Sequence, residues 1–86
     1  MDLVMNKQWG VYILQCADNT LYTGCTDHVE RRVAVHNSGK GAKYTRGRRP
    51  VELVYWEPCA DRSSALRREI ELKCLTRGQK LTLINK

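Results

Sequence analysis

The sequence predicts an α+β domain in which a small three-stranded antiparallel sheet is flanked by helices, in the order β-β-α-β-α-α. Two β-forming runs, residues 9–15 and 20–24, flank a turn-rich tetrapeptide and are expected to pair as a hairpin. A third run, residues 51–56, alternates strong β-formers before Pro58. Helical segments follow the second and third runs. The 86 residues leave room for one small domain, residues 1–86, with a modest core.

Composition and charge narrow the class of protein. Fifteen Lys and Arg stand against nine Asp and Glu, and the net charge of +6 favours an anionic partner such as nucleic acid. No apolar run approaches the ~20 residues of a membrane span, and residues 1–5 lack the basic start and long apolar core of a signal peptide. We therefore expect a cytoplasmic protein with a short tail over residues 1–8.

The cysteines are expected to be free thiols. They are Cys16, Cys25, Cys59 and Cys74. None belongs to a C-x-x-C pair, and His28 and His36 do not complete a zinc spacing. Disulfides are also rare in the cytoplasm, so neither a structural zinc nor a disulfide framework is expected.

The predicted hairpin carries two tyrosines, in the triplets Gly10-Val11-Tyr12 and Tyr22-Thr23-Gly24. Pairing of the two runs places the tyrosines on adjacent strands, where their hydroxyl groups can lie close together. The alternative is that each is an ordinary half-buried strand tyrosine.

Capping signals place three helices. The first should end at about Asn37, before Ser38-Gly39, the second covers about residues 62–75, and a short third one ends the chain. Their expected N-terminal caps are Asp27, with Glu30 three residues on, then Asp61 or Ser63, and finally Thr76 in a capping-box spacing with Gln79.

The first helix has one readable face. At about 100° per residue, Arg32 and His36 fall at the edge of the arc that Val29 and Val33 turn toward the sheet. Arg32 and His36 can therefore point into a shared cleft, whereas Arg31 projects the other way. The alternatives are a snorkelling surface arginine and a satisfied histidine at the helix end.

Residues 38–50 are expected to form a flexible basic loop with no acidic residue. Such a loop suits contact with a phosphate backbone, with Tyr44 available for stacking or packing. The alternative is a solvated charged loop. The expected nucleic-acid contacts are Lys40, Lys43, Arg46, Arg48 and Arg49.

Glu69 is the strongest physical indication of a site. On a helical wheel it falls in the middle of a face formed by Ala65, Leu66, Ile70 and Lys73. The outer side is expected to carry Arg67, Arg68 and Glu71. An inward carboxylate is costly unless it is paired, hydrogen-bonded or bound to a cation. Two interpretations stay open: an ion pair with Lys73 at i+4, or a single ligand for Mg²⁺, which keeps most of its waters.

The polar residues of the expected cleft suit a phosphodiester. They are Tyr12, Tyr22, Arg32, His36 and Glu69. Hydrolysis needs an activated water, stabilisation of negative charge and protonation of the leaving oxygen. A metal held by Glu69 would stabilise charge, and Arg32 would contact the phosphate with its fork of donors. A tyrosine of lowered pKa would act as base or proton relay.

The triplets G-V-Y and Y-T-G resemble the signature of the GIY-YIG nuclease superfamily. The likeness continues in order through Arg32, His36, the basic loop ending at Arg48-Arg49-Pro50, and Glu69. It covers about residues 9–80, the expected core of the domain. The chain resembles small single-domain bacterial members, and its basic loop and second helix also resemble the catalytic subunit of a eukaryotic structure-specific endonuclease that cuts branched DNA.

The resemblance implies an endonuclease that uses Mg²⁺ or Mn²⁺ to hydrolyse DNA phosphodiester bonds, in DNA repair or recombination. It implies Glu69 as the metal ligand and Arg32 as the catalytic arginine. His36 matches a position that holds His or Tyr in the superfamily. Tyr12 and Tyr22 match the motif tyrosines, and the sequence leaves open which is the base. Cys25 departs from the pattern, because some relatives carry a lysine there.

Two other functions are considered beside the nuclease. The runner-up is a non-catalytic nucleic-acid-binding module with a vestigial site, and the last is a scaffold whose charges serve only solubility. With no room for a separate targeting domain, we expect weak sequence preference, recognition of branched or single-stranded DNA, or a partner protein that supplies targeting.

Overall fold

The computed structural model describes residues 7–86, and its elements follow the predicted order with one addition. The addition is a single helical turn inside the segment expected to be a loop. Of the tail expected over residues 1–8, residues 1–6 lie outside the described residues. Within the described chain, no helix is long and apolar enough to cross a membrane. The elements are β1 (Gly10–Gln15), β2 (Leu21–Thr26), α1 (Val29–Asn37), α2 (Lys43–Arg46), β3 (Glu52–Pro58), α3 (Arg62–Lys73) and α4 (Arg77–Ile84).

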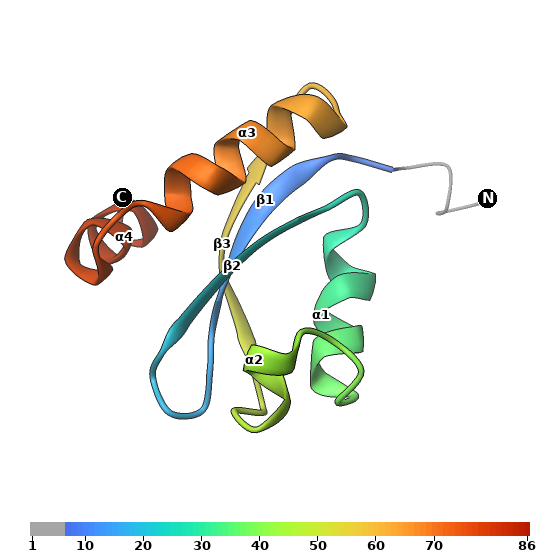
Figure 1. Ribbon diagram of the computed structural model, residues 1–86, viewed down its shortest axis with the longest axis vertical. Helices are drawn as coiled ribbons and strands as arrows, with labels where there is room; N and C mark the ends of the chain where they lie inside the picture. The colour runs from blue at the N-terminus through green and yellow to red at the C-terminus, as the bar shows by residue number, and fades with distance from the viewer. Residues whose placement is uncertain (1–6) are drawn as a thin grey trace.

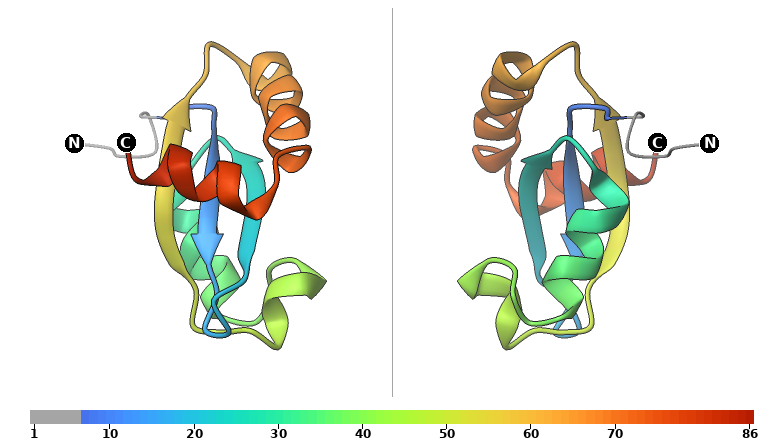
Figure 2. Two further views of the ribbon diagram at one scale, coloured as in Figure 1. Left: turned by 90° about the vertical axis from the view of Figure 1, so that its left-hand side faces the viewer. Right: turned by 90° about the vertical axis from the view of Figure 1, so that its right-hand side faces the viewer.

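The sheet is antiparallel and has the strand order β2-β1-β3, so β1 lies in the middle. Tyr12 pairs with Gly24 of β2, and these two residues share one face of the sheet. Val11 pairs with Cys25 of β2 and Glu57 of β3, and these residues share the other face. Helix α1 covers the Tyr12 face, whereas α3 and α4 lie on the Val11 face (Figures 1 and 2).

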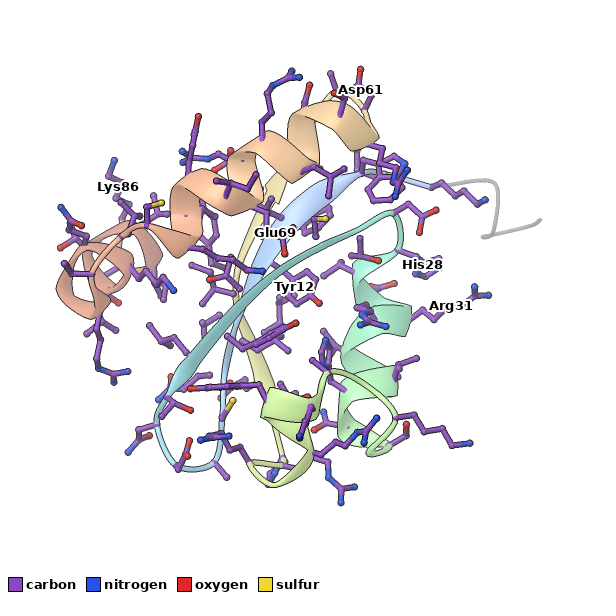
Figure 3. All side chains as sticks on the ribbon, viewed as in Figure 1. Tyr12, His28, Arg31, Asp61, Glu69 and Lys86 are labelled. Atoms are coloured by element: carbon purple, nitrogen blue, oxygen red, sulfur yellow. The ribbon has the colours of Figure 1, made fainter. Side chains whose placement is uncertain are left out.

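A buried hydrophobic cluster lies between the sheet and α1. Its buried members are Tyr12, Leu14, Cys16 and Val51. Val29 and Val33 of α1 pack against this cluster, which confirms the predicted inward face of the helix. Arg31, on the opposite side of α1, projects away from the sheet (Figure 3).

The predicted N-cap of α1 is wrong by one residue. His28, not Asp27, caps the helix, and its Nδ1 accepts from the backbone N–H of Arg31 at 3.3 Å. The cause is the length of β2, which was expected to end at residue 24. Thr26 still pairs with Gly10 in the sheet, and its hydroxyl oxygen accepts from the His28 N–H at 3.1 Å. The longer strand moves the start of the helix along the chain.

The other two helix starts agree with the prediction. Asp61 is the cap used by α3, where its carboxylate accepts from the Ser64 N–H at 2.8 Å. Thr76 and Gln79 form both hydrogen bonds of a capping box at the start of α4. A residue that caps a helix acts through neighbours in sequence, so these ends can be predicted without the fold.

The predicted inward face of α3 is partly wrong. Ile70 is 65% exposed and Leu66 is 39% exposed, although both were expected to face inward. The buried side chains of α3 are Ala65 and Leu72. Arg68, expected on the outer side, donates instead to Glu57 on the sheet beneath it at 2.9 Å. The helical wheel contains no information about Glu57, which draws this side of α3 toward the sheet.

Candidate active site

A chain of three buried polar side chains joins β1 to α1 and α2. The Tyr12 hydroxyl lies 3.0 Å from Nε2 of His36, and His36 Nδ1 lies 2.9 Å from the hydroxyl oxygen of Thr45. Tyr12 is 1% exposed, and His36 and Thr45 are fully buried. The predicted proximity of Tyr12 and His36 is therefore present, and Thr45 is a partner that the sequence did not indicate.

The hydrogen-bond network selects one tautomer of His36. The Thr45 hydroxyl donates its single hydrogen to the carbonyl of Ala42 at 2.9 Å, so toward His36 it can only accept. Nδ1 of His36 therefore carries the proton and donates to Thr45. Nε2 is left with a lone pair, which accepts the hydrogen of the Tyr12 hydroxyl.

Tyr22 extends this buried chain toward the surface. Its ring centroid lies 6.5 Å from that of Tyr12 and 5.3 Å from that of His36, in an edge-on contact with the imidazole. On α2, the Tyr44 ring stacks with Tyr22 at 5.7 Å, and the Arg48 guanidinium lies 4.0 Å from the Tyr44 centroid. Tyr22 is half-buried, so it is the more accessible of the two motif tyrosines.

Two glycines leave the space that this cluster occupies. A Cβ atom on Gly24 would lie 2.5 Å from the Tyr12 hydroxyl oxygen, so only glycine lets the phenol cross β2 there. A Cβ atom on Gly41 would collide with the His36 ring. The glycine that closes the second triplet therefore has a direct steric role in placing Tyr12.

Arg32 supplies the positive charge next to this cluster. Burial raises the pKa of Tyr12 to about 12, and the Arg32 guanidinium partly opposes this rise. Burial, and then the Arg32 charge, lower the pKa of His36. Near neutral pH, Tyr12 is thus a phenol and His36 a neutral imidazole, as the selected tautomer requires.

Glu69 projects from α3 toward the sheet, as Figure 3 shows. Its side chain is 17% exposed, and its carboxylate pairs with Lys73 Nζ at 2.9 Å. The ion pair considered from the sequence is therefore present. This contact raises the pKa of Lys73, which keeps the ammonium charged.

The carboxylate and the buried tyrosine lie on different faces of the sheet. Cys25 lies close to both regions, because its thiol is within electrostatic reach of the Tyr12 hydroxyl and of the Glu69 carboxylate. Burial, together with the Glu69 carboxylate, raises the pKa of Cys25 to about 11. Lys73 also lies close to Tyr22. The predicted residues therefore surround the β2 edge rather than line one closed pocket.

Glu69 fits a hydrated divalent ion and does not fit a fully protein-coordinated one. No three His, Cys, Asp or Glu side chains within residues 7–86 gather into a metal-binding group. Mg²⁺ often binds through one or two carboxylates and retains its waters, so a single half-buried carboxylate is a suitable donor. Such an ion would compete with Lys73 for the same oxygens.

The basic loop divides into two kinds of residue. Arg48 pairs with Asp18 at 3.0 Å and donates to the Tyr44 carbonyl, and Arg49 donates to the carbonyls of Arg46 and Asn37. These two arginines are therefore engaged in holding the loop. The exposed side chains Lys40, Lys43 and Arg46 have no ion-pair partner in the described part of the chain.

The sequence analysis missed Thr45 and Gly41, the two residues that enclose the far side of His36. Both lie in the segment that was expected to be a flexible loop. In the structure, the α2 turn folds back against α1 and buries Thr45. The only signal in the sequence was a lone threonine among charged residues, which carries little information by itself.

Comparison with known proteins places the chain among small proteins of similar length. It is 60% identical over 74 residues to UPF0213 protein SH2523 of Staphylococcus haemolyticus, covering 86% of this chain and 90% of that protein. UPF0213 protein NP_0776A of Natronomonas pharaonis is also 60% identical over 74 residues, covering 86% of this chain and 87% of its own length.

Solved structures share the fold. The solution NMR structure of UPF0213 protein BH0048 from Bacillus halodurans is 47% identical, with a TM-score of 0.58, and the match covers 91% of this chain and 83% of that one. The solution NMR structure of protein EF2693 from E. faecalis is 42% identical, with a TM-score of 0.62. This match covers 93% of this chain and 86% of that one. The GIY-YIG catalytic domain family matches residues 8–82. The triplets, the fold and this match together establish that the chain belongs to the GIY-YIG catalytic domain family.

Proposed function

We propose that this protein is a metal-dependent endonuclease that hydrolyses DNA phosphodiester bonds. The observation that carries the proposal is the buried hydrogen bond between Tyr12 and His36 next to Arg32. A surface that only binds anions through charge has no need of a buried, tautomer-selected pair. Mg²⁺ or Mn²⁺ is the proposed ion, and processing of DNA during repair or recombination is the proposed role.

We propose different roles for the two motif tyrosines, because they differ in burial. Tyr12 is 1% exposed, so an attacking water cannot reach it without movement of the protein. Tyr22 is half-buried, and we assign to its hydroxyl a proton relay, in which the oxygen accepts the proton of that water as its own hydrogen passes to bulk solvent. The Tyr12 oxygen keeps a lone pair after donating to His36, and the Arg32 guanidinium lies close enough to act on the Tyr12 hydroxyl. We propose that Tyr12, held in place by His36, helps to orient Arg32 toward the phosphate.

The remaining requirement is the stabilisation of negative charge. Arg32 would bind two phosphate oxygens through its fork of donors. Glu69 would hold the divalent ion, which when bound stabilises charge on the phosphate and on the leaving oxygen. Lys40, Lys43 and Arg46, the exposed cations of the basic loop, would contact phosphates along the bound strand.

A cleavage assay tests this function. Purified protein is incubated with supercoiled, single-stranded and branched DNA, with Mg²⁺, with Mn²⁺ or with chelator, beside a Glu69→Gln variant. Glu71→Gln is the matched control, because Glu71 lies on the same helix with a side chain that is 64% exposed. We expect metal-dependent cleavage by the wild type and the control, and none by Glu69→Gln.

The second candidate is a nucleic-acid-binding module without catalysis. The Lys73–Glu69 ion pair favours it, because it occupies the carboxylate that a metal would need. This candidate predicts salt-sensitive binding through the basic loop and no cleavage of any of the three DNA forms with either metal. That result with folded protein would replace the nuclease proposal.

A further inference from the structure

A small cavity opens between the start of β2, α2 and the first turns of α4. Its volume is about 230 Å³, and its lining residues are Thr20, Leu21, Tyr44, Arg77 and Lys80. Leu21 and Tyr44 are direct neighbours of Tyr22, one along the strand and one by ring stacking. The cavity therefore adjoins the candidate active site without sharing its polar residues.

The charge of the cavity is positive and uncompensated. No acidic residue lines it, and neither Arg77 nor Lys80 forms an ion pair with the described residues. Lys80 is half-buried, so its ammonium has lost part of its hydration without gaining an anionic partner. Asp18, which accepts from the lining Thr20, is already paired with Arg48. A bound anion would offset the cost of burying Lys80.

The size of the cavity limits the anion. Small-molecule sites usually measure ~300–1,000 Å³, so a cavity of about 230 Å³ accepts a phosphate group more readily than a whole nucleotide. Lys43 and Arg46 flank Tyr44 in the single turn of α2. The cations of the cavity, Arg77 and Lys80, thus extend the positive charge of the basic loop to α4. One DNA strand that crosses Tyr44 can meet the cations of the loop and those of the cavity.

We propose that Arg77 and Lys80 form a second phosphate-binding site, which holds a different backbone phosphate of the DNA strand from the one at Arg32. This inference rests on the proposed function, because it takes DNA to be the substrate. It adds to that function a contact between α4 and the strand, beside Tyr44.

The test measures binding without cleavage. A fluorescent single-stranded oligonucleotide is titrated in chelator at several salt concentrations with wild type, Arg77→Gln, Lys80→Gln and the double variant. Arg31→Gln is the charge-matched control for each single variant, because it removes one charge and Arg31 projects away from the sheet on α1 (Figure 3). Each lost contact to a single strand should lower the slope of log affinity against log salt by ~0.7, so the double variant should lose about 1.4.

Each outcome bears on the proposal. A double variant that keeps the slope of Arg31→Gln would overturn the second site. Arg77 is exposed in the first turn of α4, so Arg77→Gln tests the site even if Lys80→Gln unfolds. Inorganic phosphate is titrated in parallel by NMR, and shifts at Leu21 and Lys80 with free phosphate but not with the oligonucleotide would also overturn it.

The same protein samples separate this inference from the nuclease function. If the wild type cleaves DNA and the double variant binds DNA normally, the nuclease function is supported and the second phosphate site is rejected. If the wild type never cleaves DNA but the double variant shows the expected loss of slope, the second phosphate site is supported and the nuclease function is rejected.

Discussion

The Tyr12 hydroxyl donates to Nε2 of His36 across 3.0 Å, and the direction of this hydrogen bond is set by a third residue, bonded to the opposite nitrogen of the imidazole. Thr45 sets it, because its hydrogen is committed to the Ala42 carbonyl and its oxygen must accept from His36 Nδ1. The α2 turn thus fixes the protonation pattern of a side chain on α1. The same turn carries Lys43 and Arg46, so the proposed contact with DNA and the order of the candidate site depend on one short element.

The first prediction concerns Thr45. Replacement of Thr45 by Val keeps the shape of the side chain but leaves the buried Nδ1–H of His36 without an acceptor. We expect a loss of about 1–3 kcal/mol in the free energy of unfolding, measured by chemical denaturation. Thr45→Ser keeps the hydroxyl and should lose clearly less. Equal losses in both variants would show that the methyl group, and not the hydrogen bond, stabilises this site.

The second prediction concerns pH. The pKa of His36 is lowered in the folded protein, so between the unfolded value of 6.5 and the folded value the unfolded chain binds more protons. The contribution of neutral His36 to stability is therefore present above pH ~6.5 and is lost as the pH falls toward the folded pKa. Unfolding measured from neutral to acidic pH should show this decline in the wild type, and a smaller decline in His36→Gln.

The third prediction separates the two causes of that lowered pKa. Arg32→Gln removes a positive charge beside the imidazole, so the pKa of His36 should rise when it is followed by NMR titration of its ring protons. Burial remains, so the pKa should stay below its ordinary value. Arg31→Gln removes a charge that points away from the sheet and should leave the titration unchanged. An unchanged pKa in Arg32→Gln would place Arg32 too far from His36 to act with it.

Much of the fold could be predicted because it depends on local signals. Thr76 and Gln79 cap α4 through hydrogen bonds within one turn, and they do so in the structure. The face of α3 depends instead on a residue distant in sequence. Arg68 turns toward the sheet because Glu57 lies there, and Ile70 is left exposed as a consequence. The periodicity of the sequence does not show that an ion pair between α3 and the sheet forms while Ile70 stays exposed.

The candidate site shows the same division. The contact between Tyr12 and His36 follows from strand pairing and a helical face, and the sequence predicted both. Thr45 reaches His36 only because the α2 turn folds back, which charge and glycine content did not indicate. Arg48 was expected to contact DNA, yet its contacts with Asp18 and Tyr44 are visible only when the hairpin turn and α2 are placed together.

The fourth prediction concerns the space beside Tyr12. A methyl group on Gly24 would lie 2.5 Å from the Tyr12 oxygen, so Gly24→Ala must displace the phenol or the strand. We expect a loss of about 1–3 kcal/mol in the free energy of unfolding. Gly47→Ala is the control, because nothing lies within 4 Å of its added Cβ. That change should be neutral or slightly stabilising, and a similar loss in both variants would argue against a steric role for Gly24.

The last prediction concerns competition for Glu69. Lys73 holds the carboxylate at 2.9 Å, and its own side chain is 52% exposed, so the ion pair is partly screened by solvent. A divalent ion must displace the ammonium or share the carboxylate with it. Lys73→Gln should therefore tighten Mn²⁺ binding several-fold, as measured by the relaxation of water protons. Lys40→Gln removes an equal charge from the exposed loop and tests for a general charge effect.

The variants at Glu69 and Lys73 together locate the ion. Glu69→Gln should abolish the tight Mn²⁺ site, and in that background Lys73→Gln should no longer improve binding, because the shared carboxylate is gone. If Lys73→Gln tightens binding equally with and without Glu69, the ion lies elsewhere on the protein. If Lys40→Gln tightens it as much as Lys73→Gln, net charge alone explains the effect. Only dependence on both residues identifies Glu69 as the ligand and Lys73 as the resident cation that the metal replaces.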